Sequence, residues 1–206
     1  MVKRIFLIFM SALLIALLAV STVGCGCGPE EAEAKALVLD LVNRSQELNR
    51  VYYGKGLSYK DSGNPNDIYM EVSENEKYCL KSRLLADTRK VFSDTYATSI
   101  INMAFNGVAS EINQNSVQAR YMVRGDDDWL YVNKSYKPLV NTLPEYDFDT
   151  IVITKTSSRF IEATIEAVVD VKKETKNGTV IERKKDVIEV TLILEGNVWR
   201  LDSATC

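Results

Sequence analysis

Apolar side chains recur at helical spacing in the segment that covers residues 30–53. The apolar positions of this segment are Val38, Leu41, Val42, Leu48 and Tyr52. This spacing returns each side chain to the same side of a helix, so that one face is apolar and the other polar. Carboxylates at the N-terminal end favour the helix dipole. The pattern predicts a first helix.

A second helical pattern covers residues 80–105 and consists of two apolar stripes. The first stripe contains Leu84, Leu85, Thr88, Val91 and Phe92, and the second contains Tyr96, Ile100, Ile101 and Ala104. Ser93 and Asp94 stand between the stripes, and both residue types are preferred at the N-cap of a helix. We expect two helices that are joined by a tight corner.

From about residue 117 the apolar period changes from helical to alternating, which is typical of strands. Residues 117–133 predict two strands around a turn, and Asn177–Gly178 is a strong hairpin signal further along the chain. We expect a continuous antiparallel meander over residues 118–206, with one buried face and one wet face. The highly charged segment 171–185 predicts a hairpin end that projects into solvent.

Helices followed by a meander indicate an α+β fold, in which the N-terminal helices pack on a curved antiparallel sheet. This order, together with the ending "EGNVWRLDS" at residues 195–203, resembles the cystatin-like superfold shared by nuclear-transport-factor-like domains. The resemblance implies a cone that is formed by the sheet and covered by the helices. This cone allows two functions. If side chains fill the cone, the domain is a binding module, and if the cone is open, it holds a ligand.

The N-terminus has the layout of an export signal, with Lys3 and Arg4 before an uncharged apolar run. "TVGC", which ends at Cys25, resembles the lipobox of bacterial lipoproteins, although Thr22 departs from the aliphatic residue that is usual there. We therefore expect a signal peptide at residues 1–24, lipidation of Cys25, a tether at 25–31 and a single domain at 32–206. The alternative is an uncleaved transmembrane anchor. Both interpretations place the domain at the extracytoplasmic face of the cell membrane.

The composition restricts the chemistry that this chain can perform. Histidine is absent from the sequence, which excludes Ser–His–Asp and Cys–His catalysis and His-based zinc sites. There are 25 Lys and Arg residues against 28 Asp and Glu, so the chain is mildly acidic and nucleic acid is not an expected partner. No catalytic residue, cofactor or metal site is predicted.

Two cysteines in the body of the chain, Cys79 and Cys206, admit two interpretations. Outside the membrane they form a disulfide that ties the C-terminus to the start of a helix. Alternatively, one is a buried thiol and the other belongs to a loose terminus.

Several carboxylates also admit two interpretations. "GDDD" at residues 125–128 lacks the spacing of a calcium loop, and we interpret it as a solvated hairpin turn. Asp40, Glu47 and Asp87 are interpreted as parts of solvated helix faces, with a general base inside the cone as the alternative.

The segment between the first helix and the short predicted strand at residues 68–72 is a long loop rich in Gly, Asn and Asp. Its candidate partner-binding residues are Tyr52, Tyr53, Gly54, Gly56 and Tyr59. Tyrosine offers a large contact area at a low entropy cost, so these residues form a recognition patch. The alternative is that the tyrosines cover the mouth of the core.

The loop, the short strand and the step "VFSDTYATS" at residues 91–99 resemble the secreted inhibitors of cell-wall DL-endopeptidases in Firmicutes. The resemblance implies a protein-binding regulator or inhibitor of a cell-wall hydrolase, or of another envelope protein, which is not an enzyme. The alternative function is a small-ligand carrier or an enzyme that uses carboxylates and tyrosine in the cone. The sequence carries no signal for an oligomeric state.

Overall fold

The computed structural model describes residues 28–110, 113–139, 142–175 and 178–206. The predicted signal peptide at residues 1–24 and the predicted lipidation site Cys25 lie outside these residues. No helix in the described part of the chain is long and apolar enough to cross a membrane.

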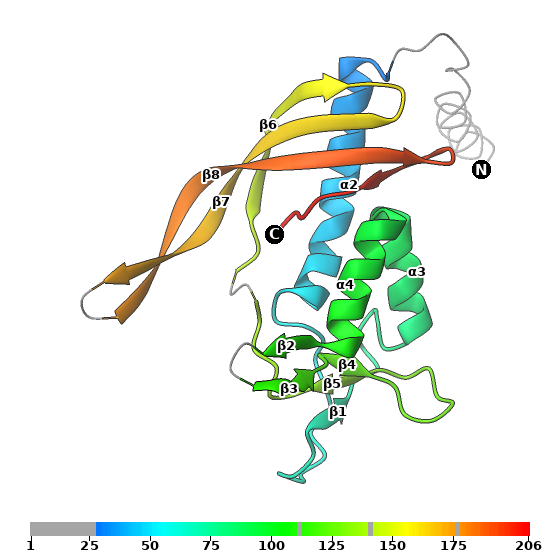
Figure 1. The fold of residues 1–206 in the computed structure, drawn as a ribbon, viewed down its shortest axis with the longest axis vertical. Helices are drawn as coiled ribbons and strands as arrows, with labels where there is room; N and C mark the ends of the chain where they lie inside the picture. The colour runs from blue at the N-terminus through cyan, green and yellow to red at the C-terminus, as the bar shows by residue number, and fades with distance from the viewer. Residues whose placement is uncertain (1–27, 111–112, 140–141, 176–177) are drawn as a thin grey trace, which may run out of the picture.

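Within the described residues, helices and antiparallel sheets combine in the predicted α+β fold (Figure 1). The helices are α2 (Glu31–Tyr52), α3 (Lys81–Val91) and α4 (Asp94–Asn106). One sheet contains, in order, β6 (Glu145–Thr156), β7 (Phe160–Thr175), β8 (Gly178–Glu195) and β9 (Val198–Leu201). A smaller sheet has the order β1 (Tyr69–Glu71), β5 (Tyr131–Asn133) and β4 (Tyr121–Met122), and β2 (Val108–Ser110) pairs with β3 (Asn113–Gln118).

The three predicted helices and the corner between the last two are confirmed. Ser93 is the N-cap of α4, because its side chain accepts a hydrogen bond from the Tyr96 amide at 3.0 Å. Phe92 has an extended backbone and ends α3 one residue earlier. The sequence therefore stops one helix and starts the next without a connecting loop.

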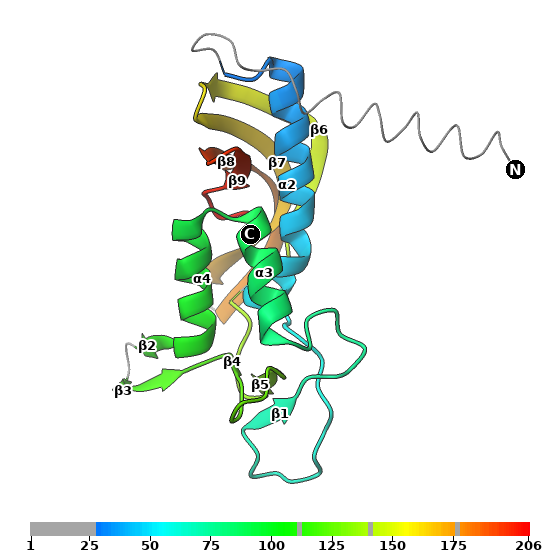
Figure 2. The same cartoon turned by 90° about the vertical axis from the view of Figure 1, so that its right-hand side faces the viewer.

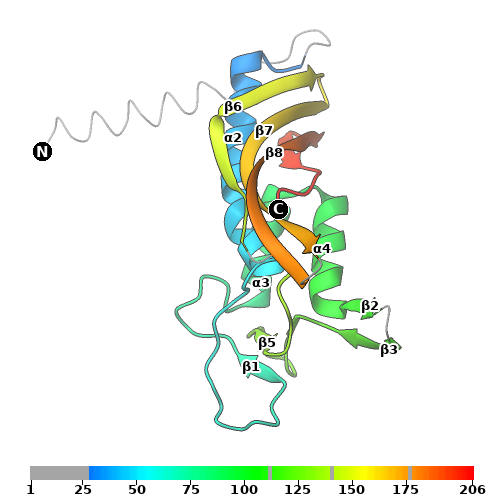
Figure 3. The same ribbon diagram turned by 90° about the vertical axis from the view of Figure 1, so that its left-hand side faces the viewer.

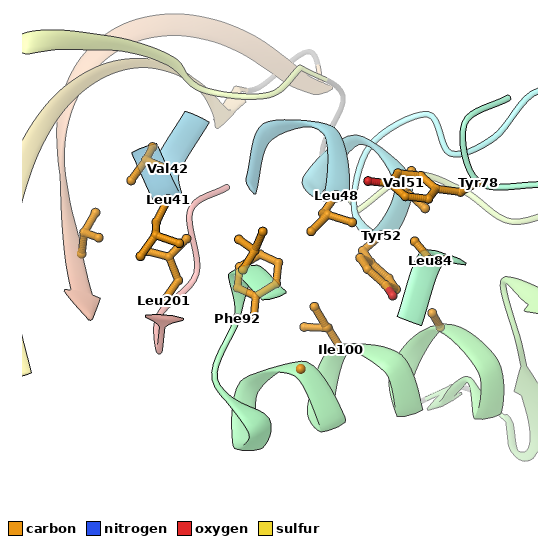
Figure 4. Close-up of a cluster of buried hydrophobic side chains, with 14 of the residues drawn as sticks. Leu41, Val42, Leu48, Val51, Tyr52, Tyr78, Leu84, Phe92, Ile100 and Leu201 are labelled. Carbon is orange, nitrogen blue, oxygen red and sulfur yellow. The ribbon is translucent and has the colours of Figure 1, made fainter. Parts of the chain in front are cut away.

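The helix α2 runs along the curved four-stranded sheet, and α3 and α4 lie beside the C-terminal half of α2 (Figures 2 and 3). The buried face of α2 presents Leu41 and Leu48 toward the centre of the core (Figure 4). Leu41 lies near Leu201 of β9, and Leu48 lies near Phe92 at the end of α3. One apolar stripe of α2 therefore joins the sheet to the helical corner.

The prediction of one continuous meander over residues 118–206 is wrong, because β4 and β5 belong to the smaller sheet with β1. The connection between β5 and β6 contains Pro138 and Pro144, which lack the N–H that a sheet ladder requires. Leu139 instead donates its backbone N–H to the carbonyl of Tyr53 at 2.9 Å. The chain leaves one sheet here, crosses the end of α2 and begins another. The antiparallel pairing on each side of this connection is confirmed.

The strands β7 and β8 extend as a ribbon beyond their neighbours. The pairing of β7 with β6 reaches Val168, whereas its pairing with β8 continues to Thr175 and Gly178. Residues 180–187 of β8 are exposed, which agrees with the predicted hairpin end in solvent. Asn177 of the predicted turn lies outside the described residues.

Cys79 and Cys206 are free thiols, so the predicted disulfide is not formed. Cys79 lies just before α3, where its carbonyl accepts a hydrogen bond from the Leu130 amide. Cys206 follows Thr205, which is buried and hydrogen-bonded to side chains in the middle of α2. The two cysteines are thus held at different parts of the fold.

Candidate functional site

The candidate site is the loop that connects α2 to β1, and its base is organised around the buried side chain of Arg120. Arg120 is 2% exposed. Its guanidinium donates to the carbonyl of Tyr52 at 2.9 Å and to that of Gly54. These carbonyls lie at the C-terminus of α2, where a cation is favoured by the helix dipole. Arg120 therefore fixes the direction in which the chain leaves the helix.

The glycines of the loop have structural roles at this base. Gly56 adopts a φ of +82°, which L-residues with side chains rarely tolerate. A Cβ on Gly56 would lie 2.5 Å from Nη2 of Arg120 and 3.0 Å from the hydroxyl of Tyr121. The chain passes so close to Arg120 that only glycine fits at this position.

A second arginine, Arg50, connects the same base to the segment after β1. Its guanidinium donates to Glu47 at 2.8 Å, to Glu76 at 2.9 Å and to the carbonyl of Gly56. Glu76 also accepts the backbone N–H of Ser58 at 2.8 Å. The first part of the loop and the segment after β1 are thereby both attached to α2.

Among the tyrosines of the predicted patch, Tyr52 is buried, Tyr53 is half-buried and Tyr59 is exposed. Tyr52 is fully buried and its hydroxyl lies 2.8 Å from that of Thr88, which donates onward to the Leu84 carbonyl. The Tyr53 hydroxyl lies 3.1 Å from that of Tyr96, and burial raises the pKa of the Tyr53 phenol above its usual value of 10.0. These two residues cover the core, as the alternative interpretation of the sequence proposed.

Tyr59 remains on the surface and is 43% exposed. Its backbone pairs antiparallel with Val72, and the next residue, Lys60, donates its N–H to the carbonyl of Glu71 at 2.9 Å. The segment around Tyr59 thus lies alongside β1 as a short added strand. This pairing fixes the backbone of an exposed aromatic residue.

The tip of the loop is ordered by its own polar side chains. Asp67 accepts hydrogen bonds from the Ser62 hydroxyl at 2.7 Å and from the Asn64 amide at 3.3 Å. Lys134, which follows β5, donates to the Pro65 carbonyl at 3.0 Å. Side-chain hydrogen bonds of this kind stabilise turns in the absence of regular secondary structure. The loop therefore has one well-defined shape.

Hollows lie on both sides of this tip. One, of about 260 Å³, is lined by Tyr59, Asp61, Gly63, Asn64, Pro65, Met70 and Lys134. The other, of about 240 Å³, has Lys60, Asp67, Arg124 and Tyr131 among its lining residues, and the Arg124 guanidinium lies 4.4 Å from the centre of the Tyr131 ring. Ile68, at the end of the loop, is 57% exposed. Apolar, aromatic and charged groups thus lie on both sides of the loop tip, and we call the residues concerned the loop surface (residues 59–68, 124, 131 and 134).

A larger hollow of about 440 Å³ lies beside a break in the register of β6, away from the loop surface. It is lined by residues 145–149 of β6, residues 166–168 of β7 and Lys185 of β8. Among the described residues, no group of three or more His, Cys, Asp or Glu side chains is placed to hold a metal ion.

The carboxylates that the sequence singled out form ion pairs on helix surfaces. Asp40 lies 3.1 Å from Arg44, Glu47 pairs with Arg50, and Asp87 pairs with Lys77 and Lys90. Asp128 of the "GDDD" turn has a role that sequence reasoning missed. Its carboxylate accepts the backbone N–H of Ser82 at 3.1 Å and so caps the first turn of α3.

Sequence reasoning found the loop and Tyr59, but it missed Arg120, Ile68 and Lys134. An apolar residue directly before a short strand, such as Ile68, is a weak signal that was available. In comparisons with known proteins, the chain matches no family model and no curated protein.

Proposed function

We propose that this chain is a membrane-anchored binding module at the extracytoplasmic face, and that its loop surface recognises a protein of the cell envelope. A cell-wall hydrolase of the DL-endopeptidase type is the partner that the sequence resemblance suggests, with the chain acting as its regulator or inhibitor. The observation that carries the proposal is the exposed Tyr59 on a loop whose shape is fixed by internal hydrogen bonds.

A fixed loop favours binding because less conformational entropy is lost when the complex forms. Tyr59 and Ile68 supply apolar contact area. Lys134 supplies positive charge beside Tyr59, and Arg124 supplies it in the hollow that Tyr131 lines. Hot spots in interfaces are enriched in tyrosine and arginine that are surrounded by groups able to exclude water. The loop surface has this composition.

The test is the affinity of a DL-endopeptidase for the wild-type chain and for two matched variants. Tyr59→Ser removes the exposed ring from the loop surface. Val198→Ser removes an apolar side chain that is 50% exposed on β9, and serves as the control. Tyr59→Ser should weaken binding at least tenfold with an unchanged melting temperature, and Val198→Ser should leave the affinity unchanged.

Tyr53→Ser separates the two interpretations of the tyrosines. Tyr53 packs against the core and bonds to Tyr96, so its loss should lower the melting temperature. A wild-type chain that neither binds nor inhibits the enzyme would reject the proposed partner. Equal binding by the wild type and Tyr59→Ser would reject the loop surface.

A further inference from the structure

A cluster of buried polar side chains surrounds Thr205, at the point where the chain returns from β9 to α2 (Figure 1). The Ser45 hydroxyl lies 2.8 Å from the Thr205 hydroxyl, and the Asn49 amide donates to that hydroxyl at 2.8 Å and to the Thr205 carbonyl at 3.0 Å. Tyr146 of β6 donates to the same carbonyl at 2.7 Å. We call Ser45, Asn49 and Tyr146 the Thr205 cradle.

The cradle is built for a residue with a hydroxyl group. Ser45 and Thr205 are 0% exposed and Asn49 is 1% exposed, so water does not compete for these bonds. A buried amide or hydroxyl without a partner is costly, which means that the cradle requires an occupant with matching polar atoms. Valine has the shape of threonine and keeps the carbonyl that Asn49 and Tyr146 contact, but without the hydroxyl it loses the bond to Ser45 and one of the two bonds to Asn49.

The occupant is attached to the sheet by few contacts. Backbone pairing of the tail with the sheet ends at Asp202, whose N–H donates to the Thr191 carbonyl at 2.8 Å. Beyond it, the Ser203 hydroxyl accepts the Thr191 amide and Ala204 is exposed. In the described part of the chain, Thr205 is hydrogen-bonded to side chains of α2 and β6. Among the described residues, release of residues 203–206 breaks one hydrogen bond to the backbone of the sheet, from the Thr191 amide to Ser203, and no backbone pair between β8 and β9.

Two further hydroxyl groups lie close to Cys206, the residue that follows Thr205. Tyr53 and Tyr96 share one hydrogen bond at 3.1 Å beside Cys206, so their pair retains donor and acceptor capacity.

We propose that the cradle is a binding site for a peptide segment that carries threonine or serine, and that Thr205 occupies it here as an internal ligand. Release of residues 203–206 opens the site to an equivalent segment of a partner protein. This site is separate from the loop surface and does not depend on the function proposed for it.

The first experiment uses the full chain with Cys25, Cys27 and Cys79 replaced by serine, so that Cys206 is the sole thiol. The rate at which a thiol reagent labels Cys206 in the native state measures release of the tail. Excess acetylated peptide Ser-Ala-Thr-Ser should raise the labelling rate severalfold by occupying the cradle, whereas Ser-Ala-Val-Ser should not. Equal labelling rates with the two peptides, or no increase with either peptide, would overturn the proposal.

A second measurement uses the chain that lacks residues 203–206. The threonine peptide should bind it about tenfold more tightly than the valine peptide, because valine leaves buried partners unsatisfied. If the shortened chain is unfolded alone, the threonine peptide should restore its circular dichroism and the valine peptide should not. Absence of both binding and refolding would contradict an internal ligand.

In the full chain, Tyr146→Phe should accelerate labelling of Cys206, and an unchanged rate would likewise count against the cradle.

Discussion

Replacement of Gly56 by alanine tests the structural base of the loop. Gly56 has a φ of +82°, and a left-handed conformation costs an alanine about 1 kcal/mol. The new Cβ would lie 2.5 Å from Nη2 of Arg120, which has little room to move because the side chain is 2% exposed. Loss of the bond from Nη2 to the Gly54 carbonyl costs about 2 kcal/mol, since the donor is charged.

We therefore expect Gly56→Ala to lower the free energy of unfolding by about 3 kcal/mol. About 0.5 kcal/mol of this loss is offset, because alanine restricts the unfolded chain more than glycine does. Gly63→Ala is the matched control. Gly63 has a φ of +72°, but no atom lies within 4 Å of the position of its Cβ. Gly63→Ala should therefore lower the free energy of unfolding only by the cost of the left-handed conformation, which is about 1 kcal/mol before the offset from the unfolded chain.

Chemical denaturation followed by circular dichroism measures both variants. The difference between them, about 2 kcal/mol, is the contribution of the contact between Arg120 and the loop. If both variants lost the same stability within about 0.5 kcal/mol, the account of Arg120 as the clamp at the end of α2 would be refuted.

Three further predictions concern other parts of the chain. Cys25→Ala should release the protein into the medium or leave an unprocessed precursor, and membrane attachment at the mature mass would contradict lipidation. Asp128→Ala should cost about 1 kcal/mol in denaturant unfolding through loss of the cap on α3, while Asp126→Ala should cost little. Burial raises the pKa of the Cys206 thiol from 9.0 to about 12, so the folded state favours the protonated thiol. Stability should thus be full below pH 9.0 and decline as the pH rises toward 12, and Cys206→Ser should remove part of this decline in unfolding measured against pH.

The helices were predictable because local signals and packing agree in them. The apolar stripe of α2 also includes Tyr52, and that helical spacing already pointed to a place in the core. Ser93 marked the corner because N-cap preference acts within a few residues. The hairpin near Gly178 was predictable for the same local reason.

The division into two sheets depends on contacts between segments that are distant in sequence. Alternation of apolar residues predicts strands but does not say which distant strands pair, so the pairing of β5 with β1 was not accessible. Pro138 and Pro144 marked a break, and the contact of Leu139 with Tyr53 shows where the chain goes instead. The strands β2 and β3 were missed because the sequence of β3 is mostly polar.

The candidate site was only partly predictable for a similar reason. Composition located the loop and Tyr59, since Gly, Asn and Asp concentrate there. Arg120 lies 66 residues beyond Gly54, and nothing in its own neighbourhood indicates that it binds the end of α2. Thr205 follows the last strand in a segment without periodicity, so its burial depends wholly on Ser45, Asn49 and Tyr146.

Hydrogen exchange of the chain with and without a DL-endopeptidase tests the central claim most directly, because it locates the contact as well as detecting it. The loop-surface account predicts slower exchange of backbone amides in residues 57–68 and 131–134 when the enzyme is present, with the β7–β8 ribbon unchanged. Slower exchange confined to the ribbon or to α2, or no change at saturating enzyme, would contradict the account.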